Sequence, residues 1–304
     1  MLTTQTWNDW SCAIDLTTQD VHLDTAAAAV RGLMDEVSRS ANRFRNDSDI
    51  SRINAAAGRF VRVAPLTIDL VEVACEVARL TAGCVDPMVG ADLIAAGYDA
   101  DIDVVRTRDA APPRHPSHTR ARWQDIRIDR TLSRVGIPAG TMLDLGASAK
   151  AWAAEESAAL AAKRTGAPVL VGIGGDLAMY RDPGDGWRVD VSEVRGDVVE
   201  ELVVSEGAMA TSSTVGRRFR GPDGAERHHL IDPRTGGAAT SRWRTASVWA
   251  PSTVIANALS TWALIDPDAA QASIEAQGLA ARFVAHDGVV AYAGSWAPPS
   301  REVA

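Results

Sequence analysis

The sequence predicts an α+β fold, in which strands and helices are mixed along one chain. Strand signals and helix signals both recur through the 304 residues, but they do not alternate as regular βαβ units. No internal repeat is found. The composition, 46% hydrophobic and 23% charged, is ordinary for a globular protein with a substantial core.

The first half of the chain is predicted to hold one strand, two helices and two loops. Residues 10–16 read as a strand, and residues 25–44 have the apolar spacing of a helix with Thr25 as its N-cap. Residues 64–83 form a second amphipathic helix that ends at Gly83. The loops are residues 45–54 and the surface loop 99–122, which is rich in Pro, Arg and Asp.

Hairpins and two further helices dominate the predicted second half. In chain order we expect a hairpin over 126–138, a strand leading into an alanine-rich helix over 141–166, a buried strand from 168 that ends in Gly174-Gly175-Asp176, short strands over 187–204, a strand followed by a helix over 246–265, and a hairpin over 281–295 turned at Asp287-Gly288.

Charge and cysteine content exclude several classes of protein. A net charge of −8 argues against a general surface for nucleic acid or anionic membranes, and no run of about 18 apolar residues is present to span a bilayer. The three cysteines show no CxxC spacing, so they fit free thiols in a reducing compartment. The first residues have neither a basic region nor a long apolar run, so we expect no signal peptide and a cytoplasmic protein.

The ten residues HHLIDPRTGG, 228–237, concentrate polar groups at the end of a predicted strand. Polar and apolar residues alternate up to Asp232, Pro233 breaks the strand, and Thr235-Gly236-Gly237 turns the chain. A strand end that delivers an imidazole and a carboxylate to a loop often presents catalytic groups. A purely structural β-turn explains the same pattern.

Four glycine-containing segments are ambiguous in the same way. In LDLGASAK, free backbone N–H groups at a helix start and the ammonium of Lys150 could hold a phosphate, although the GxxxxGK[ST] spacing is absent. GIGGDL lacks the GxGxxG spacing, so its glycines permit close approach to a neighbouring strand or to a ligand. VDPMVGADL could be a structural turn. MATSSTVGRRF could line an anion pocket or form a surface edge with solvated arginines.

Taken in their order along the chain, these segments resemble the motifs of the FAD:protein FMN transferases, the ApbE-type flavin transferases. The resemblance extends from about residue 30 to residue 290. It includes NRFRNDSDISRIN, with Asn42 where serine is usual, and VDPMVGADL, LDLGASAKAWAAEE, GIGGDL, MATSS, HHLIDPRTGG and IANALSTWALI. HHLIDPRTGG matches the most specific signature of the family directly.

The resemblance implies a fold and an activity. The expected fold is a T-fold-related single domain over residues 1–304, with mixed sheets, flanking helices and the flavin site in a central cleft. The expected activity transfers the FMN half of FAD onto a Thr or Ser hydroxyl of another protein and releases AMP. Mg²⁺ is expected to neutralise the pyrophosphate of FAD.

The resemblance also implies the residues of the site. His229 and Asp232 are the expected catalytic residues, and His228 is expected to face away because adjacent strand residues point to opposite sides. The expected FAD-binding residues are Asn42, Arg43, Phe44, Asp86, Gly90, Lys150, Glu155, Gly174, Gly175, Asp176, Ser212, Arg234 and Thr235. The expected metal ligands are Ala147, Asn257 and Thr261.

Besides Asn42, Met88 and Ala91, three further positions depart from the family pattern. Asn257 replaces the metal-binding aspartate, and because an amide brings no negative charge we expect weak Mg²⁺ binding unless Asp232, Asp176 or the substrate pyrophosphate compensates. Ala151 replaces a glycine, and Glu155 replaces an aspartate. Three functions therefore stay open at this point: FMN transfer, FAD binding without transfer, and another reaction at the same site such as FAD hydrolysis to FMN and AMP.

Overall fold

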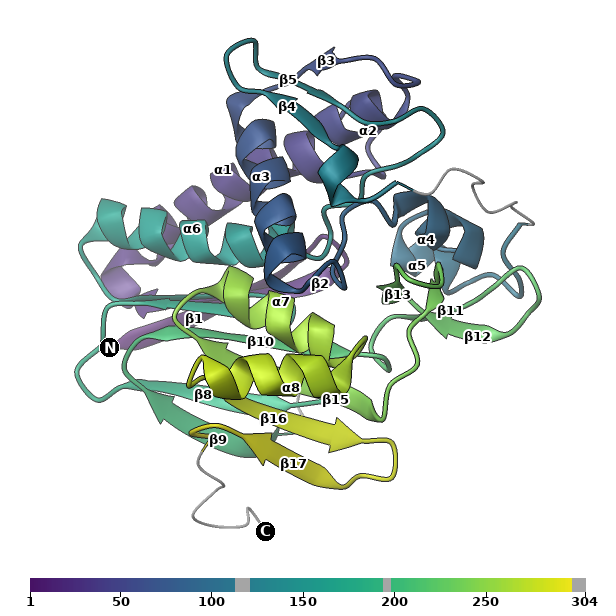
Figure 1. Ribbon diagram of the computed structural model, residues 1–304. Helices are drawn as coiled ribbons and strands as arrows, with labels where there is room; N and C mark the ends of the chain where they lie inside the picture. Colours follow the sequence, from purple (N-terminus) through teal and green to yellow (C-terminus); the bar gives the residue numbers. More distant parts are fainter. Residues whose placement is uncertain (113–120, 194–197, 297–304) are drawn as a thin grey trace. The chain divides into compact units, whose positions relative to one another are not determined.

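The computed structural model describes residues 1–112, 121–193 and 198–296 (Figure 1). The chain forms two compact units. We call the first the sheet unit; it comprises Met1–Gly32, Ala151–Gly216 and Ser241–Ala304. The second unit comprises Leu33–Lys150 and Arg217–Thr240. The expectation of one domain over residues 1–304 stays a prediction.

The sheet unit is built on an eight-stranded sheet in which every neighbouring pair of strands is antiparallel. The strand order is β1-β2-β6-β7-β10-β15-β16-β17. The bounds are Leu2–Asp9 for β1, Cys12–Gln19 for β2, Val169–Ile173 for β6, Asp176–Tyr180 for β7, Gly207–Ser213 for β10, Trp243–Ala250 for β15, Ala280–Ala285 for β16 and Val290–Ala293 for β17.

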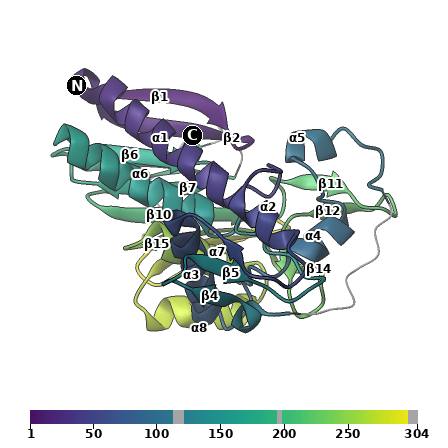
Figure 2. The ribbon, with the colours of Figure 1, turned by 90° about the horizontal axis from the view of Figure 1, so that it is seen from above.

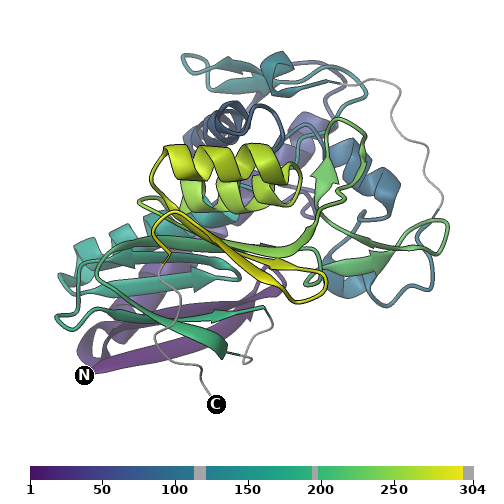
Figure 3. The same ribbon diagram turned by 60° about the horizontal axis from the view of Figure 1, so that its bottom comes forward.

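Helices lie along one face of this sheet. Helices α7, Thr253–Ala263, and α8, Pro267–Ala276, run beside each other (Figure 3). Helix α7 approaches closely because Ala210 of β10, Ala250 of β15 and its own Ala256 are small and fully buried. Helix α6, Ala149–Thr165, lies next to the first half of helix α1, Leu23–Ala41 (Figure 2).

An antiparallel pair of strands packs on the opposite face of the sheet. It consists of β8, Trp187–Ser192, and β9, Val198–Val204. Trp187, Val189 and Val191 alternate along β8, and they pack on side chains of the sheet such as Met179 and Met209. Both faces of the sheet are therefore buried, which explains why all five residues of β6 are buried.

The second unit contains the part of helix α1 from Leu33 onward and several further, mostly short elements. Its helices are α2, Asp49–Asn54, α3, Pro65–Leu80, α4, Gly90–Ala96, and α5, Ile102–Val105, with one-turn 3₁₀ segments at Asp20–His22 in the sheet unit and Trp123–Asp125 in this one. Its strands form a three-stranded sheet, β3 Val61–Arg62, β5 Arg134–Gly136 and β4 Arg127–Asp129, and two small pairs, β11 Arg218–Arg220 with β12 Glu226–His228 and β13 Ile231–Asp232 with β14 Gly237–Ala238. Leu93, Tyr98, Ile102, Val105, Phe219 and Ile231 form a buried core there.

Several expected elements are confirmed. They include the helix after Ala64, the hairpins at 126–138 and 281–295, the strands over 187–204, and the helix that begins after Ser252. Gly83 follows helix α3 with a φ of +80°, as a helix-ending glycine should. The buried strand before Gly174 is also confirmed, and a second strand, β7, follows the turn directly.

Other expectations are wrong. Helix α1 begins at Leu23, so Thr25 lies inside it. The predicted loop 45–54 contains α2, whose N-cap Ser48 accepts a hydrogen bond from Ser51 N at 3.2 Å. The segment 141–145 is not a strand and forms only an isolated bridge at Met142.

The surface loop predicted over 99–122 is also wrong in part. It contains helix α5, in which Ile102 and Val105 are fully buried. Residues 113–120 of this prediction lie outside the described residues. Within the described ranges, no helix has both the length and the apolar content needed to span a bilayer.

Candidate active site

His228 and His229 are neighbours with different surroundings. His228 closes the local turn, because its Nε2 lies 3.0 Å from the carbonyl oxygen of Ala239 and its Nδ1 accepts a hydrogen bond from Leu230 N at 3.3 Å. The Nδ1 atom of His229 is inaccessible to solvent and has no hydrogen-bond partner among the described residues. Unlike His228, His229 therefore has a ring nitrogen that no described residue engages.

Charge and burial keep His229 neutral. Burial lowers the pKa of His229 well below its usual value, and the positive charges of Arg217 and Lys150, both in the second unit, lower it further. A neutral imidazole can accept a proton. Two cations beside it suit an anionic ligand, and the negative charge of such a ligand would raise the pKa of His229 again.

Asp232 and Arg234 bind each other. The Asp232 carboxylate accepts hydrogen bonds from the backbone N of Arg234 at 2.9 Å and from its guanidinium Nε and Nη2, each at 3.0 Å. Burial raises the pKa of Asp232, but the Arg234 hydrogen bonds outweigh this effect and lower it. Thr235 accepts from Gly237 N at 3.2 Å, and Gly236 takes a φ of +75°. In this structure these residues hold the turn after His229.

Arg43 is buried in an ion pair. Its guanidinium donates to Asp144 at 2.5 Å and to the Tyr98 carbonyl oxygen at 2.7 Å, and its side chain is only 7% exposed. The guanidinium carbon lies 4.1 Å from the centre of the Phe44 ring. Asn42 accepts from Phe44 N at 2.9 Å and shapes this loop. The charge of Arg43, which was expected to contact FAD, is neutralised within the protein by Asp144, a residue that the sequence analysis missed.

Asp86 and Gly90 fix the 85–90 turn. Burial raises the pKa of Asp86, although its carboxylate accepts from Met88 N at 2.9 Å and from Trp123 N at 3.2 Å. A Cβ atom at Gly90 would lie 2.7 Å from the Met142 carbonyl oxygen, so only glycine allows this approach.

The Leu143–Ala147 segment is held by side chains from other parts of the second unit. The amide of Asn54, which the sequence analysis missed, bonds Leu143 twice, at 3.0 and 2.8 Å. Asp144 accepts from Gly146 N at 2.7 Å, and Ala147 is exposed. The segment that precedes Lys150 is thereby fixed, and Ala147 stays a predicted metal ligand.

A polar cluster in the sheet unit contains four predicted site residues. Asn257 Nδ2 donates to Asp176 Oδ1 at 2.8 Å, and Ser212 Oγ lies 2.9 Å from both the Ser260 and the Thr261 hydroxyls. Asp176, Ser212 and Thr261 are each less than 9% exposed. We call Asp176, Ser212, Asn257 and Thr261 the α7 cluster.

Strand register explains this cluster. Asp176 begins β7 opposite Ala210, and Ser212 lies two residues beyond Ala210 on the same face of β10. This is the face on which α7 packs, and Asn257 and Thr261 are one helical turn apart.

The turn before Asp176 requires glycine. Gly174 has a φ of +64°, and a Cβ atom at Gly175 would lie 2.5 Å from the Thr211 carbonyl oxygen. Thr211 N also donates to the Gly175 carbonyl oxygen at 2.9 Å. Close approach to a neighbouring strand therefore accounts for Gly175.

Glu155 caps helix α7. Its Oε2 accepts from Ser252 Oγ at 2.7 Å and from Thr253 N at 2.8 Å. The Ser252 side chain does not cap the helix itself. Glu155, which was expected to contact FAD, thus positions the helix that carries Asn257 and Thr261.

The α7 cluster has the donor chemistry for a hard cation. The amide oxygen of Asn257, Asn257 Oδ1, is buried and has no partner in the part of the chain that the structure describes. The Thr261 hydroxyl and the Asp176 carboxylate add two further oxygens, the atoms that Mg²⁺ prefers. The α7 cluster has a single carboxylate, and no group of three or more His, Cys, Asp or Glu side chains that could hold a metal occurs in the described ranges.

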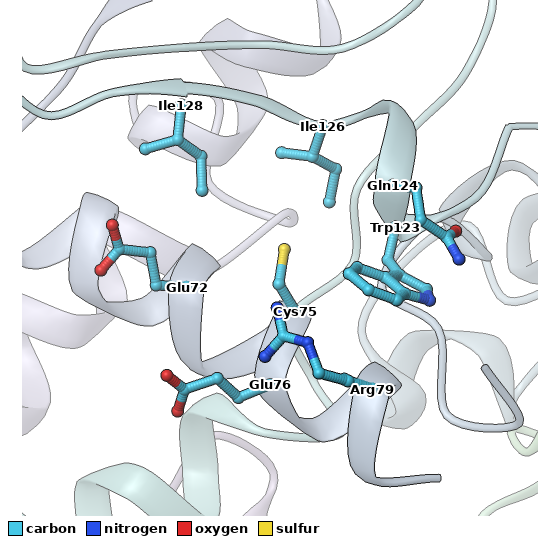
Figure 4. Close-up of a pocket in the computed structure, with 8 residues that line it drawn as sticks. All are labelled: Glu72, Cys75, Glu76, Arg79, Trp123, Gln124, Ile126 and Ile128. Atoms are coloured by element: carbon cyan, nitrogen blue, oxygen red, sulfur yellow. The ribbon is translucent and has the colours of Figure 1, made fainter. Parts of the chain in front are cut away.

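A pocket of about 280 Å³ lies elsewhere in the second unit (Figure 4). The thiol of Cys75 points into it between Ile126 and Trp123. Burial, helped by the negative charge of Asp86, raises the pKa of Cys75 to about 11, so this thiol is protonated and a poor nucleophile. None of the predicted site residues lines the pocket.

Comparisons with known proteins agree on one family. The sequence model of the ApbE family matches residues 9–283. A relative named FAD:protein FMN transferase, from Klebsiella pneumoniae (strain 342), is 28% identical over 271 residues, which are 86% of this chain and 77% of the relative. Another relative of that name, from Treponema pallidum (strain Nichols), is 31% identical over 250 residues, 74% of this chain and 66% of the relative.

Solved structures show the same fold. The crystal structure of the ApbE protein from Thermotoga maritima has a TM-score of 0.84 at 24% identity and covers 97% of both chains. The flavin transferase ApbE from Vibrio cholerae has a TM-score of 0.76 at 21% identity, again over 97% of both chains. The α+β fold and the resemblance noted in the sequence are both confirmed, and the chain belongs to the ApbE family.

Proposed function

We propose that this protein transfers the FMN half of FAD onto a Thr or Ser hydroxyl of another protein and releases AMP. Its curated relatives carry the name of this activity. Within the structure, the observation that carries the proposal is His229, a neutral imidazole with an unpartnered Nδ1 and two cationic neighbours. FAD binding without transfer and FAD hydrolysis are not favoured.

The proposed reaction needs a base and charge neutralisation. The acceptor oxygen bonds to the phosphorus nearest the flavin, the bond from that phosphorus to the bridging oxygen breaks, and AMP leaves with the bridging oxygen. His229 takes the proton of the attacking hydroxyl. The positive charges of Arg217 and Lys150 stabilise the pyrophosphate and the charge that develops on it.

A divalent cation would supply the remaining neutralisation. We propose that Asn257 and Thr261 hold Mg²⁺ in the sheet unit. The Asn257 amide contributes an oxygen and no charge, so we expect weak binding. We also propose that the other predicted FAD-binding residues contact FAD. We further propose that the protein acts in a reducing cytoplasm.

Mass spectrometry tests the proposal directly. The protein is incubated with FAD, Mg²⁺ and a peptide carrying the family's acceptor pattern, a Thr or Ser followed by Gly-Ala-Thr or Gly-Ala-Ser. We expect the peptide to gain the mass of FMN while AMP is released, His229→Ala to abolish this, and His286→Gln, at an exposed histidine of the 281–295 hairpin, to leave it unchanged. Free FMN and AMP with an unmodified peptide would instead indicate hydrolysis.

A further inference from the structure

We propose that the outer face of the three-stranded sheet β3-β5-β4 binds an acidic segment of a partner protein (Figure 1). Three arginines surround one exposed ring on this face. We call the set Phe60, Arg62, Arg127 and Arg134 the arginine face. The acceptor of FMN is the partner that the proposed reaction requires, so the identity of the partner rests on the proposed function.

Strand register places the three arginines on one side of the sheet. Val135 of β5 is fully buried and lies opposite Ile128 of β4, which lines the pocket beside α3 (Figure 4). Successive side chains of a strand point to opposite faces, so Arg134 and Arg127 point away from this buried side. Arg62 is the partner of Arg134 in the register and lies on the same outer face.

The Phe60 ring holds two of the arginines in place. The guanidinium carbons of Arg127 and Arg134 lie 4.7 Å and 4.6 Å from the centre of the ring. A Cβ atom at Gly136 would lie 2.9 Å from Arg127 Nη2 and 3.3 Å from Phe60 Cδ1, so the missing side chain of Gly136 lets both groups lie against the sheet. A guanidinium that rests on an aromatic ring keeps a fixed orientation in which it can bind a carboxylate.

The arginine face carries more positive than negative charge. Arg134 donates to Asp129 at 2.9 Å, which neutralises one charge. Arg127 donates to the Gly58 carbonyl oxygen at 2.5 Å, and this acceptor has no net charge. Arg62 is exposed, and neither Arg62 nor Arg127 has a carboxylate partner among the described residues. Two positive charges are therefore uncompensated in a protein whose net charge is −8.

The pairing of Arg62 with Arg134 does not stabilise the sheet. The two residues lie directly opposite each other in the antiparallel register of β3 and β5. Like charges in this position repel each other and destabilise a sheet. A carboxylate that binds beside both guanidinium groups would remove the repulsion, and arginine forms its strongest hydrogen bonds with such anions.

An acidic protein segment fits this face better than a nucleic acid or an anionic membrane. The positive charge is confined to a few side chains, whereas the protein as a whole is acidic and is repelled by large polyanions. An acidic segment presents separate carboxylates, and its apolar side chains can pack on Phe60, which is 38% exposed.

Fluorescence anisotropy tests this inference with no FAD present and at low salt. The probe is a labelled peptide that carries four glutamates next to the family's acceptor pattern. We expect Arg62→Glu to weaken its binding by at least about tenfold, because the variant reverses a charge at the centre of the face. Arg164→Glu is the matched control, at an exposed arginine of α6 with no carboxylate partner in the described part of the chain, and it should bind within about twofold of the natural protein.

Thermal unfolding separates a docking role from a structural one. Arg62→Glu places a carboxylate opposite Arg134, so its melting temperature should equal or exceed that of the natural protein while peptide binding is lost. No binding of the glutamate peptide, equal effects of Arg62→Glu and Arg164→Glu, or equally tight binding of a single-stranded DNA of the same charge would overturn the inference.

The two proposals can fail separately. Peptide binding that depends on Arg62, in a protein that transfers no FMN, would reject the proposed function alone. Transfer of FMN to the same peptide without any contribution of Arg62 to binding would reject the docking surface alone.

Discussion

Replacement of Glu155 should destabilise helix α7 although the residue lies on another helix. Its carboxylate accepts hydrogen bonds from the Ser252 hydroxyl at 2.7 Å and from Thr253 N at 2.8 Å, at the N-terminal end of α7. Negative charge at a helix N-terminus is favourable, and the amide there has no partner within the helix. Glu155→Ala removes both contacts and leaves the amide of Thr253, a fully buried residue, without its acceptor.

The size of the effect follows from these contacts. Loss of an N-cap acceptor costs about 0.5–2 kcal/mol, and a hydrogen bond to a charged group contributes about 1.5–3 kcal/mol. The Ser252 hydroxyl is partly exposed and can bond to water, so the Thr253 amide accounts for most of the loss. We expect Glu155→Ala to cost about 2 kcal/mol. Glu155→Asp, with a carboxylate withdrawn by ~1.5 Å, should cost about half as much.

Urea unfolding of the variants measures this difference. Glu156→Ala, at the next and more exposed residue of α6, is the control and should change the free energy of unfolding by less than about 0.5 kcal/mol. Since α7 carries Asn257 and Thr261, Glu155→Ala should also weaken Mn²⁺ binding. A Glu155→Ala protein as stable as the Glu156→Ala control would refute this account of the cap.

Three further predictions follow from the backbone and from His229. The pKa of His229 is lowered below its usual value of 6.5 in the folded protein, so its imidazole binds a proton more tightly in the unfolded chain than in the folded one. The contribution of neutral His229 to the free energy of unfolding is therefore complete above pH 6.5 and falls as the pH drops below 6.5. His229→Gln should flatten this decline in urea unfolding between about pH 7 and pH 5, and an equally steep decline would contradict the assignment. Gly175→Ala should lower the free energy of unfolding by about 2 kcal/mol, because the new Cβ would lie 2.5 Å from the Thr211 carbonyl oxygen. Gly32→Ala, in helix α1 with nothing within 4 Å of the new Cβ, should raise it by about 0.5–1 kcal/mol. Equal effects of the two variants would argue against the close approach at Gly175. Trp10 and Ser11 turn the β1–β2 hairpin with φ values of 48° and 54°, so Asn-Gly at these positions should raise stability by about 1–2 kcal/mol, and a lower melting temperature would show that the native side chains compensate the strain.

Local patterns in the sequence predicted the fold class and most helices and strands. They failed where a residue's contact lies far away in the sequence, and where a turn or a helix start uses residues that do not usually mark it. The β1–β2 hairpin was missed because its turn residues, Trp10 and Ser11, are not the glycine or asparagine that mark such turns. Helix α2 was taken for a loop because its six residues are mostly polar, and it depends on the Ser48 cap.

The same limit applies to the site. The motifs singled out His229 and the members of the α7 cluster, whose roles at a ligand stay predictions, but they did not reveal which motif residues bind other parts of the protein. Arg43 is neutralised by Asp144, 101 positions later, and Glu155 caps a helix 98 positions later. Such pairings depend on tertiary structure, and a single sequence does not reveal them.

The strand order of the sheet has a consequence for synthesis of the chain. Strand β2 pairs with β1 on one side and with β6 on the other, and Thr18 is made 151 positions before Val169, its partner in β6. At about 5–20 residues per second, this delay on the ribosome is roughly 8–30 s. During that time Ile14 and Leu16, which are fully buried in the finished protein, lack the strand that covers their edge. Until β6 is made, the nascent β1–β2 hairpin therefore has an unpaired edge that can associate with other chains, and we expect a chaperone that shields this edge to improve the yield of folded protein.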